Sequence, residues 1–140
     1  MKLFTSILAI IFCSNIALST DLKVKIKGLK SSKGKIMIAV YDSEDNWLDI
    51  EKALFHTAEI LNKKEFEIVY KDLKPGKYGV AVFHDENKDG ELNFSFFPPG
   101  PSEGIGFYGM EKMGFGRPSW NESMFSLKDD MSIEIKLINP

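Results

Sequence analysis

Residues 85–93 contain the side chains best suited to chemistry or to metal binding. Oxygen-bearing side chains stand at alternate positions, Asp85, Asn87 and Asp89, and Gly90 then permits a sharp turn. This spacing matches the first half of a calcium-binding loop, in which alternate side chains curl toward one point. The segment therefore predicts a calcium site.

The second half of a helical calcium loop is absent. The twelfth position, where a bidentate glutamate would stand, is Phe96. The remaining oxygens would have to come from the carbonyl of Glu91 and from Glu103, the nearest downstream acid. The alternative is a solvated turn, because Asp, Asn and Gly are common turn residues. The predicted metal ligands are Asp85, Asn87, Asp89, Glu91 and Glu103.

His84 directly precedes this segment and suggests an alternative, catalytic site. With Asp85 or Glu103 it could serve as the acid and base of a hydrolase or lyase. A lone histidine at a strand end more often packs or bonds a loop carbonyl, and His56 lies in a different predicted strand, which disfavours a zinc site. The only cysteine is Cys13. Ser102 has the spacing Gly-x-Ser-x-Gly within residues 100–104, but it lies in an irregular segment and not in the strand-to-helix turn of a nucleophile elbow. The sequence therefore favours a noncatalytic protein.

Residues 85–118 show no regular period and are rich in aromatic residues, proline and glycine. Aromatic rings of such a segment can form a platform for a glycan, a peptide or a lipid. The candidate ligand-binding residues are His84, Phe107, Tyr108 and Trp120. The favoured alternative is that the rings pin a long loop onto the domain, because an unanchored loop of this length carries a large ordering cost.

The N-terminus has the layout of a secretory signal peptide. Lys2 precedes an apolar run that is too short to cross a bilayer, and Ala17 and Ser19 supply the small residues before a cleavage site. We expect residues 1–19 to be removed and residues 20–140 to form one periplasmic or secreted domain without a transmembrane segment. Cys13 leaves with the signal, so disulfides cannot stabilise the domain.

Charge argues against a nucleic-acid partner. The chain has 18 basic and 20 acidic side chains, and loss of Lys2 leaves 17 basic ones. Binding to a phosphate backbone requires a concentrated positive surface, which this balance does not provide.

Alternating hydrophobicity predicts an all-β fold. Residues 22–27 alternate apolar side chains with lysines, which is the period of a strand with one solvated face. Further strands are predicted over residues 35–41, 54–60, 65–71, 77–84, 123–127 and 131–138, the last two as a closing hairpin. About seven strands at short intervals indicate a single Ig-like or transthyretin-like antiparallel β-sandwich with one long irregular loop. The predicted core residues are Leu22, Val24, Ile26, Ile36, Ile38, Val40, Phe66, Ile68, Val80, Val82, Phe125, Ile133, Ile135 and Leu137.

Residues 66–93 (FEIVYKDLKPGKYGVAVFHDENKDGELN), with GPSEG at 100–104 and GRPSW at 116–120, resemble the bacterial exported domain of unknown function DUF2141. The resemblance covers residues 22–138, and HDENKDG is among its most specific parts. This chain has Gly-Pro-Ser-Glu-Gly where the family commonly has Gly-x-Pro-x-Glu-Gly. The resemblance implies an exported Ig-like or transthyretin-like sandwich and no established activity. The positions shared with the family pattern are His84, Asp85, Asn87, Asp89, Gly90 and Glu103.

The sequence thus predicts a noncatalytic binding or structural protein of the cell envelope, stabilised by calcium. Its partner would be a glycan, peptide or protein of the envelope or the extracellular space. The alternative is the hydrolase or lyase that uses His84.

Overall fold

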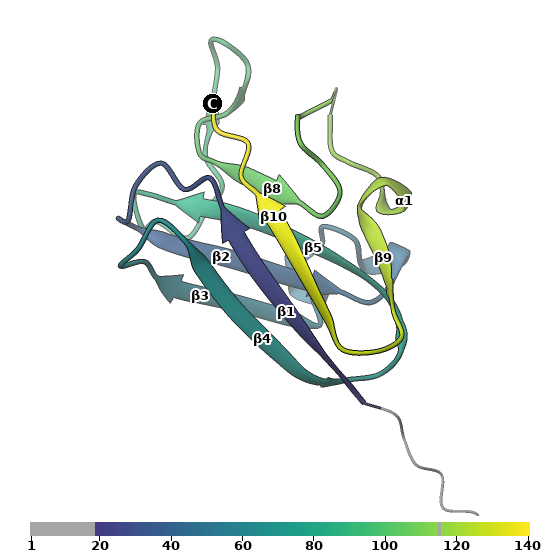
Figure 1. Cartoon of the computed structure of the whole chain (residues 1–140). Helices are drawn as coiled ribbons and strands as arrows, with labels where there is room; N and C mark the ends of the chain where they lie inside the picture. The colour runs from purple at the N-terminus through teal and green to yellow at the C-terminus, as the bar shows by residue number, and fades with distance from the viewer. Residues whose placement is uncertain (1–18, 115) are drawn as a thin grey trace, which may run out of the picture.

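The computed structural model describes residues 19–114 and 116–140, which form two β-sheets packed face to face (Figure 1). Except for Ser19, the predicted signal peptide lies outside the described residues. The first sheet has the order β10-β1-β4. Its strands are β1 (Thr20–Lys27), β4 (Phe66–Leu73) and β10 (Met131–Lys136).

The second sheet is built around the longest strand, β5. Its order is β3-β2-β5-β8, and β9 also pairs with β5. The strands are β2 (Lys35–Tyr41), β3 (Phe55–Ile60), β5 (Gly76–Asp85), β8 (Ile105–Phe107) and β9 (Met124–Leu127). A separate two-stranded ribbon consists of β6 (Phe94–Ser95) and β7 (Gly100–Pro101).

The core lies between the two sheets and follows the alternation of the sequence. On β1, Leu22, Val24 and Ile26 have no solvent exposure, while the intervening lysines face water. The run over β2 is almost continuously buried because this strand is central, between β3 and β5. Every predicted core residue belongs to this cluster, with Phe66 and Ile68 at its partly buried margin. The prediction of an all-β sandwich is confirmed.

The prediction of a closing hairpin is wrong. β9 pairs antiparallel with β5 in one sheet, whereas β10 pairs parallel with β1 in the other. The turn between β9 and β10 therefore crosses from sheet to sheet, and the sandwich is not wholly antiparallel. Alternation shows which face of a strand is buried, but it does not identify the partner strand.

Short helical turns and one aromatic cluster cover the outer face of the second sheet. The turns are η1 (Glu44–Asn46), η2 (Ile50–Lys52) and the single-turn helix α1 (Trp120–Ser123). Trp47 stands edge-on to Tyr41, Trp120 and Phe107, with ring centroids 5.2, 5.6 and 6.2 Å apart. The described residues contain no helix of the length and apolar character needed to cross a membrane.

Candidate functional site

Asp85 is the last residue of β5, and its buried carboxylate closes the loop that follows. Oδ1 accepts a hydrogen bond from the backbone N–H of Asp89 at 3.2 Å, and Oδ2 accepts one from Gly90 at 3.0 Å. Gly90 has φ +82°, a left-handed conformation in which glycine avoids the strain of a side chain. Asp85 therefore holds the 85–93 loop in a tight turn.

Glu103 comes from a different segment and joins the two ends of the same loop. Its Oε1 accepts the N–H of Glu86 and its Oε2 accepts the N–H of Asn93, both at 3.1 Å. The carboxylate reaches this place because β8 pairs with β5 and the N–H of His84 donates to the carbonyl of Gly104. Only 5% of Glu103 is exposed. Four backbone N–H groups are thus satisfied by two buried carboxylates.

A second, exposed layer of polar contacts surrounds Asp89. Its Oδ1 accepts the N–H of Glu91 at 2.8 Å, and its Oδ2 accepts the side-chain amides of Asn87 at 2.8 Å and Asn93 at 3.0 Å. The N–H of Glu91 first, and then the two amides, lower the pKa of the Asp89 carboxyl below its usual 3.8. These donors stabilise Asp89 as an anion.

Four of the five predicted calcium ligands, all except Glu91, use their side chains in hydrogen bonds within this loop, and Glu91 contributes its backbone N–H. The oxygens of Asp85 and Glu103 face N–H donors, and the N–H groups of the loop point inward at them. Across residues 19–114 and 116–140 no three His, Cys, Asp or Glu side chains are grouped so as to hold a metal ion. Calcium binding stays a prediction of the sequence pattern.

His84 lies near the end of β5, and its side chain has no solvent exposure. Its Nε2 donates to the carbonyl oxygen of Lys33 at 2.7 Å, because a carbonyl oxygen can only accept a hydrogen bond. Nδ1 has no hydrogen-bond partner among the described residues, and its nearest acidic atom is Oε1 of Glu86 at 3.9 Å. The imidazole thus ties the loop between β1 and β2 to β5, in a position closed to solvent.

The three aromatic ligand-binding candidates pack against the two sheets. Phe107 and Trp120 are buried in the cluster around Trp47, whose Nε1 donates to the carbonyl of Pro118 at 2.8 Å. Tyr108 is half-buried against the main core, 4.9 Å from Phe125 between ring centroids. These rings pin the long segment onto the sandwich.

Comparison with known proteins places this chain in a family. The sequence pattern of a family described as an uncharacterized protein conserved in bacteria (DUF2141) matches residues 24–135. The chain belongs to the DUF2141 family. Searches of curated proteins and of solved structures find no match. The matched range runs from within β1 to within β10 and contains the 85–93 loop and Glu103.

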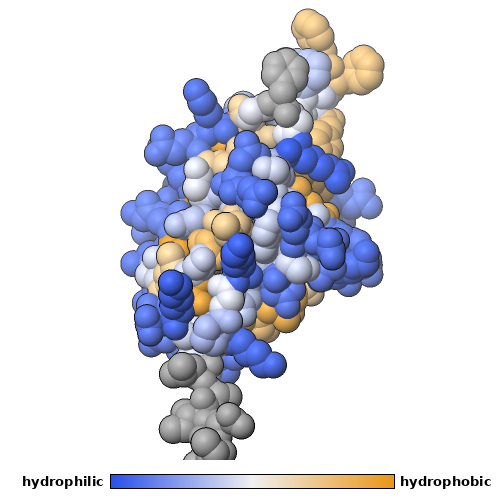
Figure 2. All heavy atoms as spheres, turned by 90° about the vertical axis from the view of Figure 1, so that its right-hand side faces the viewer, coloured by the Kyte–Doolittle hydropathy of each residue, from blue (hydrophilic) through white to orange (hydrophobic). Residues whose placement is uncertain are grey.

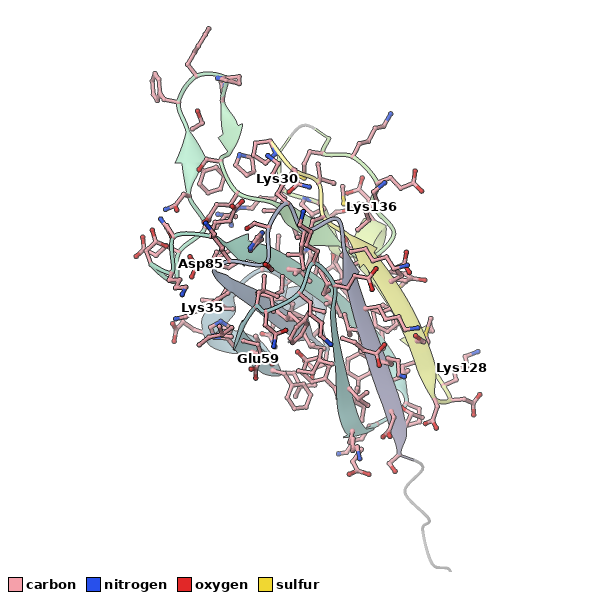
Figure 3. The ribbon with its side chains drawn as sticks, turned by 60° about the vertical axis from the view of Figure 1, so that its left-hand side comes forward. Lys30, Lys35, Glu59, Asp85, Lys128 and Lys136 are labelled. Atoms are coloured by element: carbon pink, nitrogen blue, oxygen red, sulfur yellow. The ribbon has the colours of Figure 1, made fainter. Side chains whose placement is uncertain are left out.

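The feature of this DUF2141 domain that the sequence analysis missed is the ribbon between the two carboxylates. Phe94, Phe96 and Phe97 are 68%, 98% and 90% exposed. They belong to a hairpin, residues 94–101, that stands out from the body of the protein at the end where the 85–93 loop lies (Figure 3). Its strand pairing is short, Phe94 with Pro101 and Ser95 with Gly100, so no alternating pattern marked it as a strand pair. An aromatic run beside prolines, without any charged residue, was the available signal.

Proposed function

We propose that the protein is a noncatalytic binding module of the bacterial cell envelope that contacts its ligand through the 94–101 hairpin. The observation that carries the proposal is the exposure of Phe96 and Phe97 on a projecting ribbon. Single exposed apolar residues are ordinary, but a contiguous group of large aromatic side chains indicates an interaction surface.

The burial and the hydrogen bonds of His84, Asp85 and Glu103 support a noncatalytic role. His84 and Asp85 are fully buried, and both oxygens of Asp85 and of Glu103 accept backbone N–H bonds. A general acid or base needs a proton-transfer path to substrate, which solvent-inaccessible, fully bonded carboxylates do not offer. A hollow of about 590 Å³ is lined by Met110, Lys112 and Glu122, among others, and not by His84, Asp85 or Glu103.

The hydrogen bonds of the 85–93 loop also fix the base of the 94–101 hairpin. Glu103 bonds the N–H of Asn93, and Ser102 donates its N–H to the carbonyl of Asn93 at 2.9 Å. The two ends of the hairpin are therefore fixed to the body at one place. A ligand surface that is held in its bound shape loses less conformational entropy on association than a mobile one.

Site-specific photo-crosslinking in the producing bacterium tests this proposal. A benzoylphenylalanine at position 96 should give crosslinked products of increased mass. The same group at position 60, where Ile60 is 70% exposed on β3, is the matched control for an exposed apolar site. Crosslinking at position 96 no greater than at position 60 would refute the proposal.

A further inference from the structure

The hairpin ends in a convex, apolar tip. In the space-filling view, apolar side chains project at the top of the molecule beyond the polar surface around them (Figure 2). Phe96 is 98% exposed and Phe97 is 90% exposed, so neither ring rests on the domain that carries it. A convex apolar tip needs an acceptor that is either a deep pocket or a deformable apolar phase.

The chemistry of the tip suits an apolar phase. No charged residue stands between Glu91 and Glu103. Pro98, Pro99 and Pro101 have no backbone N–H, which reduces the number of polar groups that lose water on insertion. A protein interface of ordinary size carries about one hydrogen bond per 100–200 Å², and this tip offers few donors for such bonds.

The base of the hairpin is fixed to the body of the protein by a buried carboxylate. Glu103, which ends the uncharged run, is buried and holds the N–H of Asn93. The first strand, β1, begins at the opposite end of the molecule from the hairpin (Figure 1). The described domain can therefore place the aromatic tip in a surface while its charged sheet faces stay in water.

We propose that Phe96 and Phe97 insert into the interfacial region of a phospholipid bilayer, so that the hairpin docks the protein on a membrane surface. This inference rests on the proposed function and names the ligand class of the same hairpin. Phe is among the apolar side chains that interfacial protein segments bury at the boundary between headgroups and acyl chains, and binding there increases with the apolar area buried. Because the tip is uncharged, attachment is driven by apolar burial and depends little on salt. Two rings give reversible attachment, unlike a transmembrane helix.

Sedimentation with vesicles of phosphatidylethanolamine and phosphatidylglycerol tests the inference on the purified exported protein. We expect the wild type to sediment with the vesicles at both low and high salt. Phe96→Ser should lower the partition coefficient about tenfold, in line with the loss of one buried aromatic side chain. Ile60→Ser removes an exposed apolar residue of β3 and should leave partitioning unchanged.

Phe96→Trp supplies a second readout. This variant should retain vesicle binding. Lipid should shift the fluorescence emission of the new indole to shorter wavelength, and the wild type should show no such shift. Failure of the wild type to sediment, or equal binding by Phe96→Ser and wild type, would overturn the lipid inference. Loss of binding at high salt would also overturn it, because charge would then be the driving force. A protein crosslinked at position 96 without vesicle binding would refute lipid docking and leave the binding-module proposal standing.

Discussion

Glu103 is the residue on which the geometry of the 85–93 loop most depends, because its carboxylate contacts both ends. In Glu103→Gln, one oxygen becomes an NH₂ group that faces a backbone N–H, so one charge-assisted bond is lost and two donors oppose each other. We expect the free energy of unfolding to fall by about 1.5–3 kcal/mol. Urea unfolding measures this loss. Glu91→Gln, an exposed substitution in the same loop, should change it by less than about 0.5 kcal/mol. Equal midpoints for the two variants would contradict the role of Glu103.

Substitution of Asp85 distinguishes between two states of the 85–93 loop, one held by hydrogen bonds alone and one that also binds calcium. Asp85→Asn should destabilise the protein by the same amount in excess calcium and in chelator, because the lost partners are the N–H groups of Asp89 and Gly90. If calcium is a ligand, the wild type gains stability in calcium, about 2.7 kcal/mol at one hundred times the dissociation constant, and the variant gains less. Thermal unfolding of both proteins in both buffers decides between these outcomes.

Asp89 gives the loop a defined pH dependence. Its pKa is lowered by the N–H of Glu91 and by two amides, so the contribution of the anion to stability is present above pH 3.8 and is lost as the pH falls through the folded-state pKa. The stability difference between wild type and Asp89→Asn should therefore shrink as the pH falls below 3.8. Carboxyl NMR titration should give a midpoint below that value. A midpoint at or above 3.8 would show that these hydrogen bonds do not favour the anion.

Among the elements, β5 depends on a glycine where its outer face meets the aromatic cluster. A Cβ at Gly79 would lie 2.6 Å from the ring of Trp47 and 2.8 Å from that of Trp120. Gly79→Ala should destabilise the protein by about 1–3 kcal/mol through overpacking and should alter the near-ultraviolet circular dichroism of the tryptophans. Gly76→Ala lies in the same strand, with its nearest neighbour at 3.6 Å, and should leave that spectrum unchanged. A normal tryptophan spectrum in Gly79→Ala would show that the cluster can move aside.

The elements also show how far the sequence could predict this structure. The alternation on β1 and the apolar run of β2 give their buried faces, because the period of side chains along a strand is a local property. The partners of β9 and β10 depend on contacts between residues far apart in the sequence, and the local pattern of Phe125 and Ile133 does not contain them. β8 was missed because three residues are too few to show a period.

The candidate site was predictable to a similar extent. Alternating polar residues and Gly90 located the loop, and the structure brings Glu103 to it. The sequence could not predict which aromatic side chains of this segment are buried. Phe107 is covered by the aromatic cluster around Trp47, whereas Phe96 projects into water, although both are phenylalanines of one irregular segment. The difference follows from the pairing of β8 with β5, which is a tertiary contact.

At the scale of the whole molecule, the sandwich and the hairpin are separate structural units, and we predict separate roles for them. The hydrophobic core lies between the sheets and includes no residue of the hairpin. Asn93 and Ser102 are already joined by a backbone hydrogen bond at the base of the ribbon. Stability should therefore reside in the sandwich and ligand contact in the tip.

Replacing residues 94–101 by a two-residue Asn-Gly turn tests this separation. The turn can close between paired backbone segments, and the bond from the N–H of Asn93 to Glu103 can persist. We expect the free energy of unfolding to stay within about 1 kcal/mol of the wild type, since the deleted rings are exposed. Vesicle binding should be lost at the same time. A large loss of stability would show instead that the hairpin supports the fold, and its exposed aromatic residues would then need a structural explanation.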